Sequence, residues 1–236
     1  MGGVSVVENL SVKVREASND VLEAILCHPF LTQLADGSLP KSAFGYFLRE
    51  DGHYVDNFAQ CLSALAAKAP NAEWRLTLLD HARASMEAEK ILHAVLLKEL
   101  NLPATNPKDC PSPTTLSYAS YLTSTCHVQP FATGLVSLFP CYWIYGEVAR
   151  ELSKLGSTDP IYQIWINNYS GSDYSDTVSH IVEMIDVVGG SLDQSQADAL
   201  AGTYGLGSRF ELMFWDAAFR EESWPLEGTM RRTIGV

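Results

Sequence analysis

The segment Leu138–Tyr145, which reads LFPCYWIY, is the most informative stretch of this chain. Cys141 and Tyr145 are four residues apart, so in a helix both side chains point to the same side. Their neighbours are apolar and aromatic, which would place the thiol against a buried aromatic wall. Such a thiol could be a nucleophile. A buried cysteine with only a packing role fits the same pattern.

Helical spacing of apolar residues continues through almost the whole sequence, and no strand-like alternation interrupts it. We therefore expect an all-α protein of about eight helices, too many for a simple four-helix bundle. No Gly/Ser-rich or Pro-rich linker divides the chain, which favours a single domain over residues 1–222 and an irregular tail over 223–236. The expected helices cover 11–27, 40–68, 72–100, 114–125, 130–155, 160–169, 174–188 and 194–222.

The composition excludes several classes of function. A formal net charge of −12, without any basic run, argues against a nucleic-acid surface and against an anionic membrane. The apolar runs are too short or too interrupted to span a bilayer. The five cysteines are odd in number and form no CxxC pair, and the N-terminus shows no secretory signal. We therefore expect free thiols and a cytoplasmic location.

Asp51 and Tyr54 form the second candidate group. They are three residues apart and continue an apolar helical stripe that includes Leu48 and Val55. A carboxylate on such a stripe needs a partner or a ligand, because burying it alone is costly. An exposed acid in an acidic protein is the alternative. The other polar side chains of this stretch are expected in solvent: Glu50, His53 and Asp56.

Glu211 is a second carboxylate in an aromatic setting, between Phe210 and Phe214 and next to the turn that carries Trp215. Burial there would raise the pKa of Glu211, which suits general acid–base catalysis near neutral pH. A surface glutamate beside a core stripe is the alternative. Two further aromatic residues, taken singly, indicate no more than packing: Tyr118 and Tyr169.

Two acid–histidine pairs have the spacing of possible metal ligands on one helix face, namely Glu89 with His93 and Asp176 with His180. Pairs of this kind more often stabilise a helix surface. Nucleotide-binding and serine-hydrolase fingerprints are absent from the sequence. We therefore expect neither a metal nor a cofactor.

Taken together, these segments resemble the TenA family, also called thiaminase II or aminopyrimidine aminohydrolase. The resemblance extends from about Val21 to Trp215. Its motifs, in order, are His28-Pro29-Phe30 followed by Asp36-Gly37-Ser38-Leu39-Pro40, then Asp51-x-x-Tyr54, Tyr118, Cys141-x-x-x-Tyr145, Tyr169, and Glu211-x-x-Phe214-Trp215. No single motif is decisive, but the ordered set is specific. Cys141 places the chain in the cysteine class of the family.

The resemblance implies a haem-oxygenase-like helical fold without haem, and a homotetramer. It implies hydrolysis of 4-amino-5-aminomethyl-2-methylpyrimidine, a breakdown product of thiamin, to the hydroxymethylpyrimidine used in thiamin salvage. Cleavage of thiamin itself is a second activity of some members. The expected partners are therefore these small molecules, not nucleic acid or membrane.

The resemblance also implies a role for each motif residue. Cys141 would be the nucleophile that adds to the ring, and Glu211 would relay protons to the leaving amine and from the attacking water. Asp51 would bind the ring amino group and help set the state of the thiol. The remaining residues would hydrogen-bond, stack on the ring or form walls: Tyr145, Tyr118, Tyr169, Tyr54 and Phe214. One thiol, two carboxylates and aromatic walls suit a flat, partly cationic heterocycle.

The chain departs from the family pattern beside Asp51, where it has Glu50, Gly52 and His53. The extra acid could point outward or alter the pocket, which bears on the substrate. Two alternatives to the hydrolase stay open: a protein that only binds a pyrimidine, and an enzyme of the same fold recruited to another substrate with metals at the two acid–histidine pairs.

Overall fold

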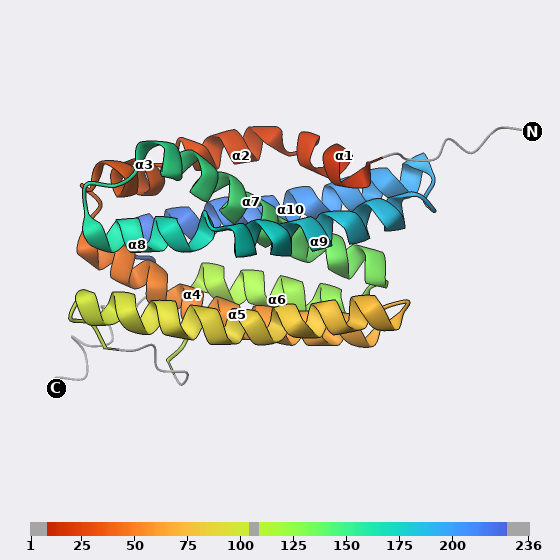
Figure 1. The fold of residues 1–236 in the computed structure, drawn as a ribbon, viewed down its shortest axis with the longest axis horizontal. Coiled ribbons are helices and arrows are strands. Elements are labelled where there is room, and N and C mark those ends of the chain that lie inside the picture. Colours follow the sequence, from red (N-terminus) through yellow and green to blue (C-terminus); the bar gives the residue numbers. More distant parts are fainter. Residues whose placement is uncertain (1–8, 104–108, 226–236) are drawn as a thin grey trace, which may run out of the picture.

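The computed structural model describes residues 9–103 and 109–225, except the side chains of residues 88–90. Within these residues the chain forms ten α-helices and no strand (Figure 1), which confirms the expected all-α class. The helices are α1 (Leu10–Glu16), α2 (Asn19–Leu26), α3 (Pro29–Asp36), α4 (Lys41–Ala67), α5 (Ala72–Glu99), α6 (Pro113–Val128), α7 (Phe131–Leu155), α8 (Pro160–Tyr169), α9 (Ser172–Gly189) and α10 (Gln194–Arg220).

The N-terminal region differs from the prediction. The single helix expected over 11–27 is two helices, because the chain turns at Ala17 and Ser18 between α1 and α2. A further short helix, α3, follows directly, with Pro29 in its first turn and the ring of His28 accepting a hydrogen bond from the Phe30 backbone N–H. Gly37, with φ of +83°, ends α3 in a left-handed conformation that favours glycine.

Four helices are capped at their N-termini. In each, a side chain accepts a hydrogen bond from a backbone N–H group that has no partner within the helix. These caps are Asn71 for α5, Ser112 for α6, Asp159 for α8 and Asp193 for α10. Each such cap typically contributes about 1 kcal/mol. The caps therefore fix where the helices begin and, with them, the register of the residues that follow.

The helices form layers, with α1–α3 on one side, α4–α6 on the other, and α7–α10 between them (Figure 1). Aromatic rings fill the core where α4 and α10 meet. The ring of Phe47 stacks on Trp215 with centroids 5.1 Å apart, and Phe30 and Trp165 also contact Trp215. Trp215, part of the C-terminal motif, is thus a core residue.

Pro140 lies inside α7, directly before Cys141, where a proline removes a helical hydrogen bond. Gly207 of α10 accommodates its ring. A Cβ at that glycine would lie 2.8 Å from Pro140 Cγ and 3.3 Å from the carbonyl oxygen of Ser137. This close approach holds the middle of α7 against α10 and so fixes the position of Cys141.

The described part of the predicted tail packs on the body of the molecule, because the indole N–H of Trp224 donates to the carbonyl of Pro111 at 2.9 Å. Residues 226–236 of that tail lie outside the described residues. None of the described helices is long and apolar enough to cross a membrane.

Candidate functional site

A cavity of about 620 Å³ opens between α4, α5, α7 and the turn from α8 to α9. Five of the eight predicted site residues line it: Asp51, Tyr54, Cys141, Tyr145 and Tyr169. They come from three helices that are far apart in sequence. The fold therefore brings most of the predicted set to one place.

Cys141 and Tyr145 both face this cavity from α7, as their spacing predicted. Cys141 is partly exposed and is not in a disulfide, and Tyr145 is buried. The hydroxyl of Tyr174 donates to the carbonyl oxygens of Cys141 and Tyr142, at 3.3 and 3.2 Å. This contact ties the thiol-bearing turn of α7 to the start of α9.

Asp51 is 2% exposed, so the alternative of a solvent-exposed acid is wrong. Its carboxylate Oδ2 lies 2.9 Å from Nε2 of His93, which reaches across from α5 and is itself buried. A buried carboxylate is tolerated when it is hydrogen-bonded and paired. His93 therefore provides the partner that the apolar stripe around Asp51 requires.

Glu211 is 1% exposed and accepts a hydrogen bond from the hydroxyl of Tyr118 at 2.8 Å. Burial raises the pKa of Glu211 to about 8, and the negative charge of Asp51 adds to the rise, while the Tyr118 hydrogen bond opposes it. The predicted rise in the pKa is confirmed. Glu211 can thus gain and lose a proton near neutral pH.

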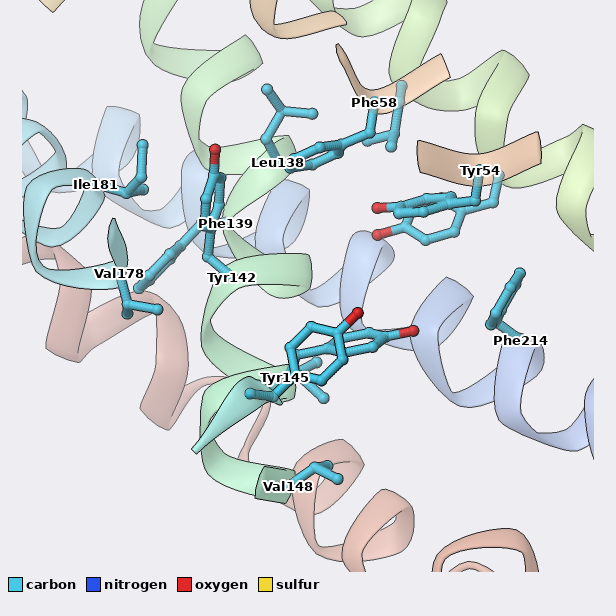
Figure 2. Packing of buried hydrophobic residues seen from close by; sticks show 14 of the residues in the cluster. Tyr54, Phe58, Leu138, Phe139, Tyr142, Tyr145, Val148, Val178, Ile181 and Phe214 are labelled. Atoms are coloured by element: carbon cyan, nitrogen blue, oxygen red, sulfur yellow. The ribbon is translucent and has the colours of Figure 1, made fainter. Parts of the chain in front are cut away.

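The aromatic residues of the motifs form a continuous group around the two carboxylates. The ring centroid of Tyr54 lies 5.0 Å from that of Tyr118 and 5.9 Å from that of Phe214, while Tyr145 and Tyr169 are 5.3 Å apart. Tyr54 and Tyr145 turn their hydroxyl ends toward the same space (Figure 2). The remaining three predicted residues lie behind Tyr54 and not on the cavity wall: Tyr118, Glu211 and Phe214.

The hydroxyl of Tyr54 is buried next to Cys141 and Tyr118, but no hydrogen bond of good geometry holds it within the described part of the chain. Burial raises the pKa of Tyr54 well above its usual value, and the nearby Cys141 adds to the effect. The phenol is therefore uncharged. Its donor and acceptor sites are available to a polar group placed beside the thiol.

The residues that depart from the family pattern do not line the cavity. Glu50, expected in solvent, instead accepts a hydrogen bond from the backbone N–H of Ser112 at 2.9 Å, at the start of α6. His53 is half-buried, not solvated, and Asp56 is exposed as expected. The extra acid next to Asp51 thus points away from the cavity and anchors a helix start, because carboxylates favour helix N-termini.

Of the two acid–histidine pairs considered as metal ligands, Asp176 with His180 is the pair whose side chains both belong to the described part of the protein. His93 contacts Asp51, and the side chain of Glu89 lies outside the described residues. Asp176 and His180 are both exposed. Among the described residues, no three histidine, cysteine or acidic side chains are grouped so as to hold a metal ion.

Several residues that line the cavity were not predicted from the sequence. His81 of α5 lines the cavity, with Nδ1 3.2 Å from the hydroxyl of Tyr142. Burial, and to a smaller extent the neighbouring His180, lowers the pKa of His81 to about 4. Asp173, at the start of α9, also lines the cavity. The one-turn spacing of His81 and Ser85 could have marked this face of α5.

The arrangement combines a thiol, two buried carboxyl groups with different partners, and aromatic walls. A flat ring can lie between the walls, a carboxylate can accept its N–H groups, and a carboxyl group that titrates near neutral pH can transfer protons. Cys141 contributes a thiol to the cavity wall, and a thiol has the chemistry of a nucleophile.

Comparison with known proteins agrees with this architecture. The model of the TENA/THI-4/PQQC family matches residues 13–221. The aminopyrimidine aminohydrolase of Bacillus subtilis (strain 168) is 31% identical over 215 residues, which is 91% of each chain. A TenA homologue from P. horikoshii OT3 superimposes with a TM-score of 0.82 at 29% identity, covering 91% of this chain and 99% of its own.

A domain from Shewanella denitrificans OS217, described as having a heme oxygenase-like fold, superimposes with a TM-score of 0.66 at 15% identity, over 92% of this chain and 94% of its own. At this identity the likeness concerns the fold alone, and it confirms the haem-oxygenase-like fold expected from the sequence. The family model spans nearly all of the described residues and every predicted site residue. The chain therefore belongs to the TENA/THI-4/PQQC family.

Proposed function

We propose that this protein is an aminopyrimidine aminohydrolase of thiamin salvage, which hydrolyses 4-amino-5-aminomethyl-2-methylpyrimidine and also cleaves thiamin. The observation that carries the proposal is a cavity with aromatic walls that is lined by Cys141 and Asp51, with the buried Glu211 behind Tyr54. The 31% identity to a relative of that name supports the same activity.

In the proposed reaction the pyrimidine lies between Tyr54 and Tyr169, and Asp51 accepts a hydrogen bond from its ring amino group. Cys141 adds through its thiolate sulfur to an electron-poor ring carbon, and the electron pair moves through the ring to break the bond between the methylene carbon and the amine. Glu211 gives the leaving amine its proton, so ammonia departs. Tyr145 hydrogen-bonds within the site.

The second half of the reaction reverses these movements. Water adds to the methylene carbon and passes a proton to Glu211, and the carbon–sulfur bond breaks to restore the aromatic ring and the thiolate of Cys141. Glu211 acts first as acid and then as base, a role that a pKa of about 8 suits near neutral pH. Tyr118 hydrogen-bonds Glu211 and keeps it in place, and Phe214 supports the ring of Tyr54.

The test is product formation from the aminomethylpyrimidine and from thiamin, with wild type, Cys141→Ser and the matched control Cys110→Ser. We expect Cys141→Ser to lose at least about 10³-fold in kcat, because a hydroxyl replaces the thiol nucleophile. The control removes an exposed thiol outside the cavity and should keep full activity. Normal turnover by Cys141→Ser would remove Cys141 from the mechanism. Binding without product by folded wild-type protein would instead support a pyrimidine-binding protein.

The proposal includes a homotetramer in the cytoplasm. Four large apolar side chains on α5 are exposed, at 42–68% of their full area, and a partner copy would cover them: Leu76, Leu79, Ile91 and Val95. The five cysteines form no disulfide, which is consistent with a reducing compartment and can be checked by cell fractionation.

A further inference from the structure

The cavity has an inner and an outer part that differ in character. The inner part holds the buried Asp51 and Tyr54 and the thiol of Cys141. The outer part is lined by more exposed polar side chains, among them His81 and Asp173. Pockets for drug-sized ligands span roughly 300–1,000 Å³. At about 620 Å³ the cavity exceeds what one pyrimidine ring with short substituents occupies.

The charge of the outer part is negative or neutral. The described residues that line the cavity include two carboxylates, Asp51 and Asp173, and neither lysine nor arginine. His81 is the remaining group that could carry a positive charge there, and burial together with His180 lowers its pKa to about 4, so it is neutral at physiological pH. An anionic group in this part would meet no opposite charge.

The start of α9 also lies at the rim, through Gly171, Ser172 and Asp173. A helix N-terminus of this length attracts anions through its free N–H groups and dipole. Asp173 sits in the first turn and places a carboxylate at that position. The N-terminus of α9 could attract a phosphate to the outer part, but the carboxylate of Asp173 already lies beside it.

The aromatic side chains of the outer part suit a positively charged group. The rings of Tyr142 and Tyr174 line the same space, and aromatic faces attract cations. His81 and Tyr142 hydrogen-bond each other at 3.2 Å and so hold the wall in place.

Cleavage of thiamin already requires a subsite for the leaving group, and the outer part of the cavity is its place. We propose that Asp173 makes this subsite selective: it admits a neutral or cationic group attached at the aminomethyl position of the pyrimidine and excludes phosphate-bearing versions of that group. The inference rests on the proposed function, since the inner part must hold the pyrimidine. The thiazolium ring of thiamin has the matching chemistry, whereas thiamin monophosphate adds the excluded anion.

The test compares kcat/KM for thiamin and for thiamin monophosphate in wild type, Asp173→Asn and Asp173→Lys. Wild type should prefer thiamin. Asp173→Asn should raise the ratio of monophosphate to thiamin about fivefold, the effect of removing one unit charge near an anion in a water-like medium, and Asp173→Lys should raise it further. Asp176→Lys is the control, with a like charge change at an exposed α9 position outside the cavity lining, and its ratio should stay at the wild-type value.

An unchanged ratio in Asp173→Lys would overturn the subsite. If the wild-type protein turns over neither compound, the part of the proposed function that concerns thiamin fails, and failure with the aminomethylpyrimidine as well would overturn the whole proposed function. Calorimetric dissociation constants for the two compounds then take the place of kcat/KM. The wild-type protein would then bind thiamin more tightly than the monophosphate, and Asp173→Lys would reduce or reverse this preference. That result would support the subsite even though the protein lacks the enzyme activity. Equal affinity of the wild-type protein for both compounds would refute it.

Discussion

Replacing Glu211 by glutamine should change how the stability of the protein depends on pH. The pKa of this carboxyl group is raised from 4.5 to about 8, chiefly by burial. The folded protein therefore keeps a proton on Glu211 that the unfolded chain releases above about pH 4.5. Its contribution to stability is fully present below that pH and is lost as the pH rises toward 8. At about 1.4 kcal/mol per pKa unit, the full effect is roughly 5 kcal/mol.

Glutamine has nearly the same shape, is neutral at every pH, and its carbonyl oxygen can still accept the hydrogen bond from Tyr118. The free energy of unfolding of Glu211→Gln minus that of the wild type should therefore rise by roughly 3 kcal/mol between about pH 5 and pH 7.5. Urea denaturation followed by circular dichroism at four pH values measures it.

Glu99→Gln is the matched control, because Glu99 is exposed near the end of α5. Solvent surrounds this carboxylate in the folded and the unfolded chain. The free energy of unfolding of Glu99→Gln minus that of the wild type should therefore vary little with pH. If the difference in free energy of unfolding between Glu211→Gln and the wild type did not change with pH, the argument that burial keeps Glu211 protonated would be refuted. That result would also remove the reason for assigning Glu211 the proton transfers.

Two further changes test the surroundings of the site and the assembly. Tyr118→Phe deletes the hydroxyl that lowers the pKa of Glu211. In the pH profile of kcat/KM, the limb that belongs to Glu211 should therefore move to higher pH, and kcat/KM should fall about tenfold because a buried acceptor loses its partner. An unmoved limb would contradict this. Ile91→Lys puts a charge in the exposed apolar face of α5, so light scattering should report a mass below that of the proposed tetramer, whereas an unchanged mass would show that this face is not the interface.

The sequence was informative about the fold where local signals mark a boundary. Pro40 before α4 and the pair Gly189 and Gly190 at the end of α9 stand where the structure begins and ends these helices. The turn between α1 and α2 carries neither glycine nor proline. It follows from packing, since both helices contact α10 but α1 also contacts α9, whereas α2 also contacts α3 and α7. Such contacts leave no trace in local periodicity.

The site shows the same division. The spacing of Cys141 and Tyr145 and the aromatic neighbours of Glu211 were readable, because both depend on one helix alone. The partner of Asp51 was not, because His93 is 42 residues away and pairs with it only when α4 and α5 lie side by side. Its spacing from Glu89 suggested a metal ligand instead. Pairing across helices is a property of the tertiary fold, which one sequence does not display.

The partners of the two carboxyl groups explain how one cavity can hold both. Asp51 faces an imidazole at 2.9 Å, a group that can donate a hydrogen bond to a carboxylate and share its charge. Glu211 faces a phenol and aromatic rings, and the charge of Asp51 further favours its protonated form. Glu211 can therefore carry a proton near neutral pH. In the proposed reaction Asp51 binds the amino group of the pyrimidine, while Glu211 supplies the proton that the departing amine needs.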